Sequence, residues 1–147
     1  MIGPVTIRVL GVPAPQGSKR SLGNGRMVES SKRVKPWRQS VAYAVQGRNV
    51  EGTTAAVRVD IDFKFRRPRA HLGQGKNYDR VKASAPAFPV SRAVGDLDKL
   101  CRATFDGLVD GGIIADDSQI VELHTAKTYL GPHELTVGAI VRIEEIT

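Results

Sequence analysis

Apolar and polar residues alternate over several stretches of the chain, and this pattern predicts β-strands. Residues 55–65 show it most clearly, with apolar side chains on one face and charged side chains on the other. Residues 5–10 and 135–143 alternate in the same way, and residues 119–127 form a further strand-like run. We therefore expect a sheet with one buried face and one face in solvent.

Two acidic residues of the clearest strand, Asp60 and Asp62, share its polar face. They point the same way because successive side chains of a strand alternate between its two faces. This makes them candidates for extra metal ligands. We expect them instead to pair with basic neighbours on the solvent face of a half-exposed sheet.

Two other stretches carry apolar residues at helical spacing. Residues 36–47 have Pro in the first turn and Gly at the end, and Trp37 lies on their apolar stripe, so we expect Trp37 to pack in the core. Residues 96–109 carry a second stripe, with Asp96 as the N-cap. Together the elements predict an α+β fold with a mixed β-sheet, forming one domain over residues 1–147.

Two segments between these elements are rich in Pro, Gly and basic residues. Residues 12–26 are predicted to be a long basic loop without a regular element. Residues 66–90 are predicted to be a second irregular loop that carries positive charge to the start of the second helix. The alternative for such loops is a solvated, mobile segment that contacts nothing.

The composition is that of a globular domain, with 147 residues of which 41% are hydrophobic and 25% are charged. No run of 18 apolar residues and no signal-like start are present, so we expect a cytoplasmic protein without a membrane partner. Cys101 is the only cysteine and lies at an apolar helical position. It is therefore expected to be a buried thiol.

Charge is distributed unevenly along the chain. Residues 1–92 contain 18 Lys and Arg against 5 Asp and Glu, whereas residues 93–147 contain 4 against 10. A basic field of this size attracts phosphate polymers, which favours nucleic acid as the partner. The alternative is that the two halves of the chain attract each other in the fold.

Four carboxylates form two short acidic knots on either side of the second helix: Asp96 with Asp98, and Asp116 with Asp117. Residues two apart on a regular helix point to nearly opposite sides, so Asp96 and Asp98 converge only if Asp96 lies in an extended cap. We expect the two knots to meet at a metal ion. An all-oxygen ligand set suits Mg²⁺, and the three His lack the spacing of a zinc site. The alternative is that the carboxylates only cap helices and balance charge.

These motifs resemble the RusA-type Holliday junction resolvases. The resemblance is carried by Gly95-Asp96-Leu97-Asp98-Lys99-Leu100, Ala103-Thr104-Phe105-Asp106-Gly107-Leu108, Asp116-Asp117-Ser118-Gln119-Ile120-Val121 and Lys127. It is close over residues 95–129 and weaker elsewhere. It implies a RusA-like fold and a small homodimeric endonuclease of bacteria and phages. Such an enzyme uses Mg²⁺, with Mn²⁺ as an alternative ion, to cut four-way DNA junctions in recombination, repair or phage DNA processing.

The resemblance also implies roles for individual residues. The family's metal-binding aspartates correspond to Asp96, Asp98 and Asp117, which selects Asp117 over Asp116. The family's catalytic lysine corresponds to Arg102, which is a departure from the family's pattern. Because an arginine side chain stays protonated, it suits phosphate binding better than proton transfer. Lys127 matches a basic residue expected to point toward the site. Four basic loop residues are expected to hold the arms of the DNA: Lys19, Arg20, Arg67 and Arg69.

Two alternative functions stay open at this point. The chain could be a non-catalytic nucleic-acid-binding protein whose acidic knots only cap a helix. It could also be an inactive family member that binds junctions without cutting them, for which the arginine at position 102 is the best argument.

Overall fold

The computed structural model describes residues 3–17, 19–23, 26–29 and 32–147. Its centre is a four-stranded sheet in the order β1 (Val5–Leu10), β6 (Gly138–Glu145), β4 (Val57–Phe65) and β5 (Ile120–Tyr129). β4 pairs in parallel with β5 and antiparallel with β6, and β1 pairs antiparallel with β6. The predicted α+β fold with a mixed sheet is therefore confirmed.

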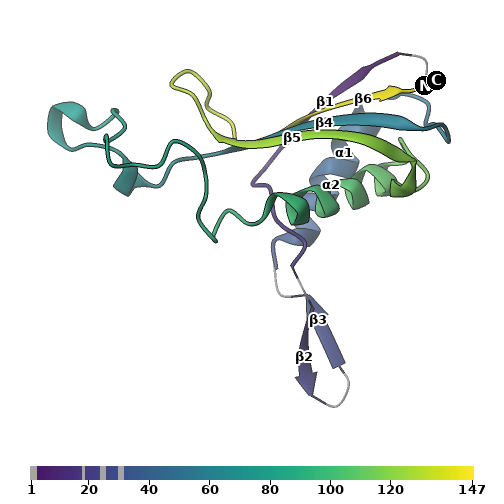
Figure 1. Cartoon of the computed structure of the whole chain (residues 1–147), viewed down its shortest axis with the longest axis horizontal. Coiled ribbons are helices and arrows are strands. Elements are labelled where there is room, and N and C mark those ends of the chain that lie inside the picture. Colours follow the sequence, from purple (N-terminus) through teal and green to yellow (C-terminus); the bar gives the residue numbers. More distant parts are fainter. Residues whose placement is uncertain (1–2, 18, 24–25, 30–31) are drawn as a thin grey trace.

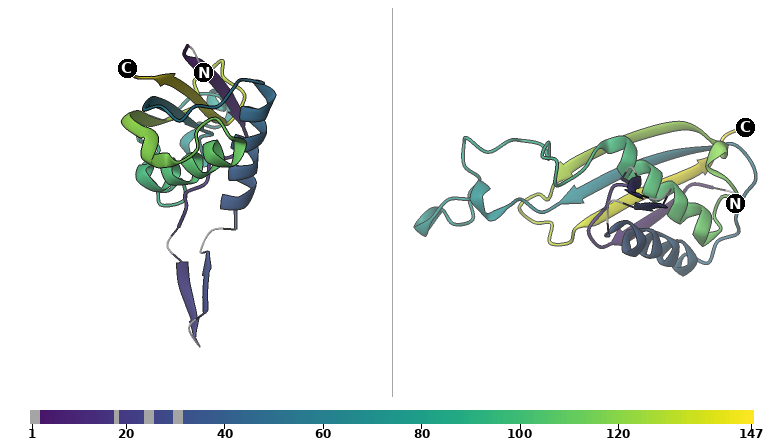
Figure 2. Two further views of the ribbon diagram at one scale, coloured as in Figure 1. Left: turned by 90° about the vertical axis from the view of Figure 1, so that its right-hand side faces the viewer. Right: turned by 90° about the horizontal axis from the view of Figure 1, so that it is seen from below.

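Two helices, α1 (Val34–Gly47) and α2 (Leu97–Gly111), cover one face of this sheet (Figures 1 and 2). The other face carries no helix (Figure 2). The burial pattern of β4 explains why only one face is covered. Its odd-numbered residues are buried and its even-numbered residues are partly exposed, as the alternation predicted. Burying the apolar face under two helices removes it from water, which is the main favourable contribution to folding.

The two helices approach each other closely through glycines of α2. A Cβ atom on Gly107 would come within 2.5 Å of the Val41 Cβ on α1, so only glycine fits at this contact without movement. Nearby, the Trp37 indole nitrogen donates a buried hydrogen bond of 3.0 Å to the Thr104 hydroxyl. The expected packing of Trp37 in the core is confirmed.

Consecutive strands are not always neighbours in the sheet. β5 and β6 follow each other in the chain, yet β4 lies between them. The Gly131-Pro132 segment therefore crosses the end of β4 instead of closing a hairpin. As a result, among the residues that the structure describes, β5 pairs with a strand on one side only.

The prediction that residues 12–26 contain no regular element is wrong. Strands β2 (Lys19–Gly23) and β3 (Arg26–Glu29) pair antiparallel as a separate two-stranded sheet, which projects away from α2 in Figure 1. Pairing satisfies backbone groups that a loop would leave to water, and Met27 and Val28 tolerate extended backbone. The Asn24-Gly25 dipeptide, a common hairpin-turn sequence, was the available signal.

Residues 66–96 form a second projection, beyond the end of β4 (Figure 1). It contains two short 3₁₀ helices, η1 (Arg69–His71) and η2 (Gly75–Asn77), and a bridge between Leu72 and Val81. The rest of this segment is irregular, as predicted. We call residues 66–96 the arm.

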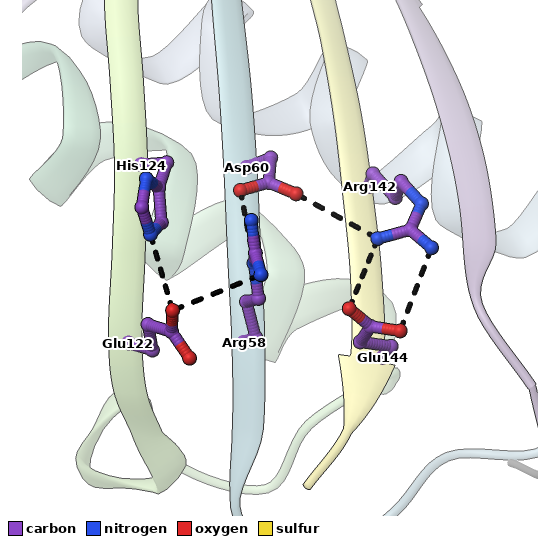
Figure 3. Close-up of polar contacts among 6 residues, drawn as sticks. All are labelled: Arg58, Asp60, Glu122, His124, Arg142 and Glu144. Carbon is purple, nitrogen blue, oxygen red and sulfur yellow. Dashed lines mark hydrogen bonds and ion pairs between the residues drawn. The ribbon is translucent and has the colours of Figure 1, made fainter.

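The open face of the sheet carries a ladder of charged residues across three strands (Figure 3). Asp60 pairs with Arg58 at 3.3 Å and with Arg142 at 3.7 Å. Asp62 lies 3.8 Å from Lys64. Both aspartates thus pair with basic neighbours on the solvent face, which confirms that expectation. Such exposed pairs contribute little stability each.

Candidate functional site

The N-terminus of α2 brings the first two aspartates together. Asp96 occupies the N-cap position with extended backbone, and Asp98 lies in the first turn of the helix. The Asp96 side chain makes no capping hydrogen bond and lies 3.5 Å from Lys99. Both carboxylates are exposed at the end of the helix where the peptide dipoles favour negative charge. The predicted extended cap is therefore present.

The backbone just before Asp96 is held from two sides. Gly95 has a φ of +98°, and a Cβ atom there would come within 2.5 Å of the Pro15 ring. The Gln16 amide donates a hydrogen bond of 3.0 Å to the Lys99 carbonyl. The segment that leads into the β2–β3 hairpin thus packs directly on the start of α2, so the hairpin emerges beside the two carboxylates.

Lys127 reaches the same place from the sheet. Its side chain extends from β5 and donates a hydrogen bond of 2.8 Å from Nζ to the Gly95 carbonyl. It therefore points toward the start of α2, as expected from the sequence. A cation here lies beside Asp96 and Asp98 and is positioned to attract a phosphate brought to them.

Arg102 follows Asp98 by four residues on α2, so the two side chains share a face of the helix. Arg102 is exposed and forms no ion pair or hydrogen bond within the part of the chain that the structure describes. Its guanidinium is therefore available to a ligand. The planar guanidinium can donate hydrogen bonds to two oxygens of one phosphate group.

The second acidic knot has a different local role for each aspartate. Asp116 caps the short helix η3 (Asp117–Gln119): its carboxylate accepts a hydrogen bond of 2.9 Å from the Ser118 amide, while Gln119 Oε1 accepts one from the Asp116 amide. The hydrogen bonds from Ser118 lower the pKa of Asp116 below its usual value. The exposed Asp117 carboxylate has no hydrogen bond or ion pair among residues 3–17 and 32–147.

The two knots lie at opposite ends of α2. Asp96 precedes the helix, whereas η3 follows its C-terminal end and is tied to the residues before β4 by the Gln119 side chain, which donates to the Thr53 and Ala55 carbonyls. Figure 1 shows β5 starting beside the C-terminal end of α2 and running back toward its start. A helix of 15 residues is roughly 22 Å long.

Within a single copy the two knots therefore do not come together, and the expectation that they meet at a metal ion stays a prediction. No group of three or more metal-ligating side chains occurs among the described residues. The reason is the connection after α2: Ile113 and Ile114 are buried and the chain enters β5 at once, so Asp117 stays at the far end.

The predicted DNA-binding residues occupy the two projections. Lys19 and Arg20 lie on β2, and their side chains fall outside the described part of the structure. Arg67 donates hydrogen bonds to the Pro86 carbonyl at 2.8 Å and stacks on the Tyr129 ring at 4.3 Å. Arg69 donates to the Gly73 and Tyr78 carbonyls. Both arginines thus organise the arm, and their contact with DNA stays a prediction.

A cleft opens between the arm and the segment that follows β5. It has a volume of about 820 Å³ and is lined in part by Arg66, Arg67 and Arg69. Tyr129 also lines it, two residues beyond Lys127 on the same face of β5. The basic cleft therefore adjoins the α2 N-terminus.

Cys101 is buried and takes no part in the exposed site. Burial raises the pKa of its thiol, which outweighs the opposing effect of the hydrogen bond with Thr125. A thiol of this kind is not a nucleophile at neutral pH. The expected buried structural thiol is confirmed.

The structure gives a role to two residues for which sequence reasoning assigned none. Gly95, known from the sequence only as the first residue of the motif Gly95–Leu100, turns the chain into Asp96 and accepts the Lys127 hydrogen bond. Gln16 has a buried side-chain oxygen with no partner among the described residues, close to the start of α2. Nothing in the sequence distinguishes it from other loop amides.

Comparison with known protein families supports a nuclease. The family model described as "Endodeoxyribonuclease RusA" matches residues 11–142, which is most of the chain. No curated protein matches the chain. Among the described residues, no helix has both the length and the apolar character needed to span a bilayer.

Proposed function

The chain belongs to the RusA family of endodeoxyribonucleases, and on this premise we propose that it is a Mg²⁺-dependent enzyme that cuts four-way DNA junctions as a homodimer. The observation that carries the proposal is the N-terminus of α2. Two exposed carboxylates, Asp96 and Asp98, lie there beside the Lys127 cation.

The donor set at this point fits a hard divalent ion. Magnesium in nucleotide-processing sites is typically held by one or two carboxylates, with water and substrate phosphate in the other positions. Asp96 and Asp98 would hold the ion, and Mn²⁺ would substitute for it because it prefers the same oxygen ligands. An ion held by these two carboxylates would supply a water of lowered pKa and would offset negative charge on the phosphate oxygens.

The chain's own cations position the phosphodiester. Lys127 is fixed by its hydrogen bond to the Gly95 carbonyl, so its charge stays close to the two carboxylates before substrate arrives. Arg102 lies one turn along α2 and binds the phosphate without proton transfer, because a guanidinium stays protonated. A preorganised cation of this kind stabilises negative charge that develops at phosphorus.

Preference for branched DNA follows from the two basic projections. The β2–β3 hairpin and the arm leave the molecule in different directions from the region of the α2 N-terminus (Figure 1). Lys19 and Arg20 on the hairpin and the arginine-lined cleft of the arm would each contact a different DNA arm through its phosphates. Straight duplex would engage one projection at a time.

A cleavage assay tests this proposal. A synthetic four-way junction and a duplex of the same sequence are incubated with the protein at increasing Mg²⁺, Mn²⁺ or Ca²⁺, with Asp98→Asn as the inactive control. The proposal expects Mg²⁺-dependent cuts in the junction and none in the duplex. Cutting that survives in EDTA, or equal cutting of both DNAs, contradicts it.

The second candidate, an inactive junction-binding family member, is favoured by Arg102, which stands where the family's catalytic lysine is expected. A gel-shift assay on the same junction distinguishes three hypotheses: an active nuclease, an inactive junction-binding member and a general nucleic-acid-binding protein. Tight junction binding without cuts under any of these ions supports the inactive member. Equal binding to junction and duplex without cuts supports a general nucleic-acid-binding protein.

A further inference from the structure

The cleft between the arm and the loop that follows β5 is not used by the chemistry at the α2 N-terminus. Figure 1 shows the arm and this loop beyond the same end of the sheet. The cleft has a volume of about 820 Å³, a size typical of clefts that bind small organic groups. Five apolar residues contribute to its walls: Leu72, Val81, Leu130, Pro132 and Leu135. A ligand of this cleft would therefore have an apolar body.

One wall of the cleft is formed by a stacked pair of planar groups. The guanidinium carbon of Arg67 lies 4.3 Å from the centre of the Tyr129 ring, and His71 packs edge-on against the same ring at 5.6 Å. Hydrogen bonds to the Pro86 and Ala87 carbonyls, of 2.8 Å and 3.4 Å, orient the guanidinium. Aromatic rings and arginine planes are the groups on which unstacked nucleobases stack. The wall therefore suits a planar aromatic ligand.

The two sides of the cleft are linked before any ligand arrives. Arg66, at the start of the arm, donates a hydrogen bond of 3.4 Å to the Leu135 carbonyl in the loop after β5. Within the arm, a bridge pairs Leu72 with Val81, both of which line the cleft. A preformed site loses less conformational entropy on binding than a site that must be ordered by its ligand.

The charge around the cleft favours a ligand that carries phosphates. Residues 66–92 contain seven Lys and Arg against a single acid, Asp79. Arg66 and Arg69 are exposed and line the cleft. The Glu134 carboxylate also lines it, but accepts a hydrogen bond of 2.9 Å from the Gly131 amide and lies 3.6 Å from Lys64. Proteins that bind unpaired DNA combine such a cationic surface with planar side chains that stack on bases.

The position of the cleft relates it to the phosphate at the α2 N-terminus. Lys127 extends from β5 to the Gly95 carbonyl, beside Asp96. Tyr129 lies on the same face of β5, about 7 Å further along the strand. A base that stacks on the Arg67–Tyr129 pair would therefore belong to a nucleotide close to the phosphodiester held at the carboxylates.

We propose that the cleft holds one unpaired nucleobase of the branched DNA, stacked against the Arg67–Tyr129 pair, while Arg66 and Arg69 bind the phosphates beside it. This inference rests on the proposed function and deepens it. Removing a base from its pair is costly within a straight duplex and cheapest where the base is mismatched or already single-stranded. The cleft thereby favours DNA at a branch point over uninterrupted duplex.

A binding experiment measures the contribution of the base. Two sets of four-way junctions carry, at each nucleotide beside the cut in turn, either a mismatched thymine or an abasic site, and dissociation constants are measured in EDTA. Neither junction has a pair at that position, so the ratio of the two constants isolates the base. At one position, wild type is expected to bind the mismatched thymine about tenfold more tightly than the abasic site.

Two variants assign this ratio to the cleft. Tyr129→Ala removes the ring of the stacked pair, so the ratio should fall close to one. Tyr43→Ala is the matched control, because Tyr43 is 80% exposed on α1 and does not line the cleft, and it should keep the wild-type ratio. Thermal midpoints of both variants check that each is folded.

A photocrosslinking experiment locates the base in the wild-type protein, so it does not depend on the folding of a variant. The mismatched thymine is replaced by 5-iodouracil, the complex is irradiated and the protein is digested with trypsin. Cleavage after Lys127 and Arg142 releases residues 128–142, which contain Tyr129 and the loop after β5. The proposal expects the crosslink on this peptide.

The outcomes separate this inference from the proposed function. A wild-type ratio close to one at every position overturns the base site, as does an unchanged ratio in Tyr129→Ala or a crosslink found only on other peptides. If wild type cuts junctions but shows one of these results, the proposed function stands and the base site fails. If wild type binds junctions without cutting them, the proposed function fails, while a tenfold ratio and a crosslink on residues 128–142 still establish the base site.

Discussion

Lys127 and Gly95 are joined by a hydrogen bond of 2.8 Å, from the lysine Nζ to the glycine carbonyl, across 32 residues of sequence. This bond fixes the far end of β5 to the residue that precedes Asp96. It places a cation at the carboxylates and also holds the backbone turn that presents them.

Replacing Lys127 by Met should therefore impair both stability and cleavage. Loss of a partly buried, charge-assisted hydrogen bond is expected to cost about 1.5 kcal/mol in free energy of unfolding, measured by urea denaturation. Junction cleavage should fall by at least tenfold, because the phosphate loses a positioned cation. Lys64→Met is the control: that lysine pairs with Asp62 and Glu134 on the open face, so its loss should leave cleavage unchanged.

Asp117→Asn should abolish junction cleavage without lowering stability, because the Asp117 carboxylate has no partner in the described part of its own chain. Asp116→Asn should retain cleavage, because Asp116 caps η3 and asparagine still accepts a cap hydrogen bond. Cleavage rates and thermal midpoints of the two variants check this. The reverse pattern, with Asp116→Asn inactive and Asp117→Asn active, would make the assignment wrong.

The same cap predicts a pH dependence of stability. The hydrogen bonds from Ser118 lower the pKa of Asp116 in the folded state. A lowered pKa stabilises the folded state above the unfolded pKa of about 3.9, and this contribution is lost as pH falls through the folded value. The stability difference between wild type and Asp116→Asn should thus be constant near neutral pH and shrink below about pH 4. Urea titrations at several pH values measure it, and a difference that grows on acidification would contradict the cap.

Substitutions at Arg102 distinguish a phosphate-binding role from an inactive site. Arg102→Ala should lower cleavage on the order of a hundredfold, as loss of one charge-stabilising donor does in other enzymes. Arg102→Lys should cleave at least as fast as wild type, because the resemblance described above implies a lysine at this position. Single-turnover rates on a four-way junction check both. If Arg102→Ala cleaves the junction as fast as wild type, Arg102 has no role in phosphate binding at the site.

Gly107→Ala should destabilise the fold although alanine has the higher helix propensity. The added methyl group would meet Val41 at 2.5 Å, and such overpacking costs about 1–3 kcal/mol. Gly47→Ala is the matched control at the end of α1, where nothing lies within 4 Å of the added Cβ. Urea denaturation should show a loss for the first variant and none for the second.

Local pattern was sufficient to predict most of the elements. The alternation in residues 5–10 and 55–65 and the apolar stripes of the two helices depend on neighbours in sequence, and the structure places β1, β4, α1 and α2 close to the predicted bounds. The extended cap at Asp96 was also predicted, because it follows from helix geometry alone. The β2–β3 hairpin was missed, since its Pro- and Gly-rich context outweighed a short strand signal.

The sequence by itself determined which residues carry charge, which faces are apolar and which carboxylates flank α2. Only the tertiary structure decided that β4 separates β5 from β6, that Lys127 reaches Gly95, and that the two acidic knots lie at opposite ends of a helix. These relationships depend on strand order and on the direction in which β5 runs past α2. Both are set by packing the whole sheet against two helices, and no local spacing encodes them.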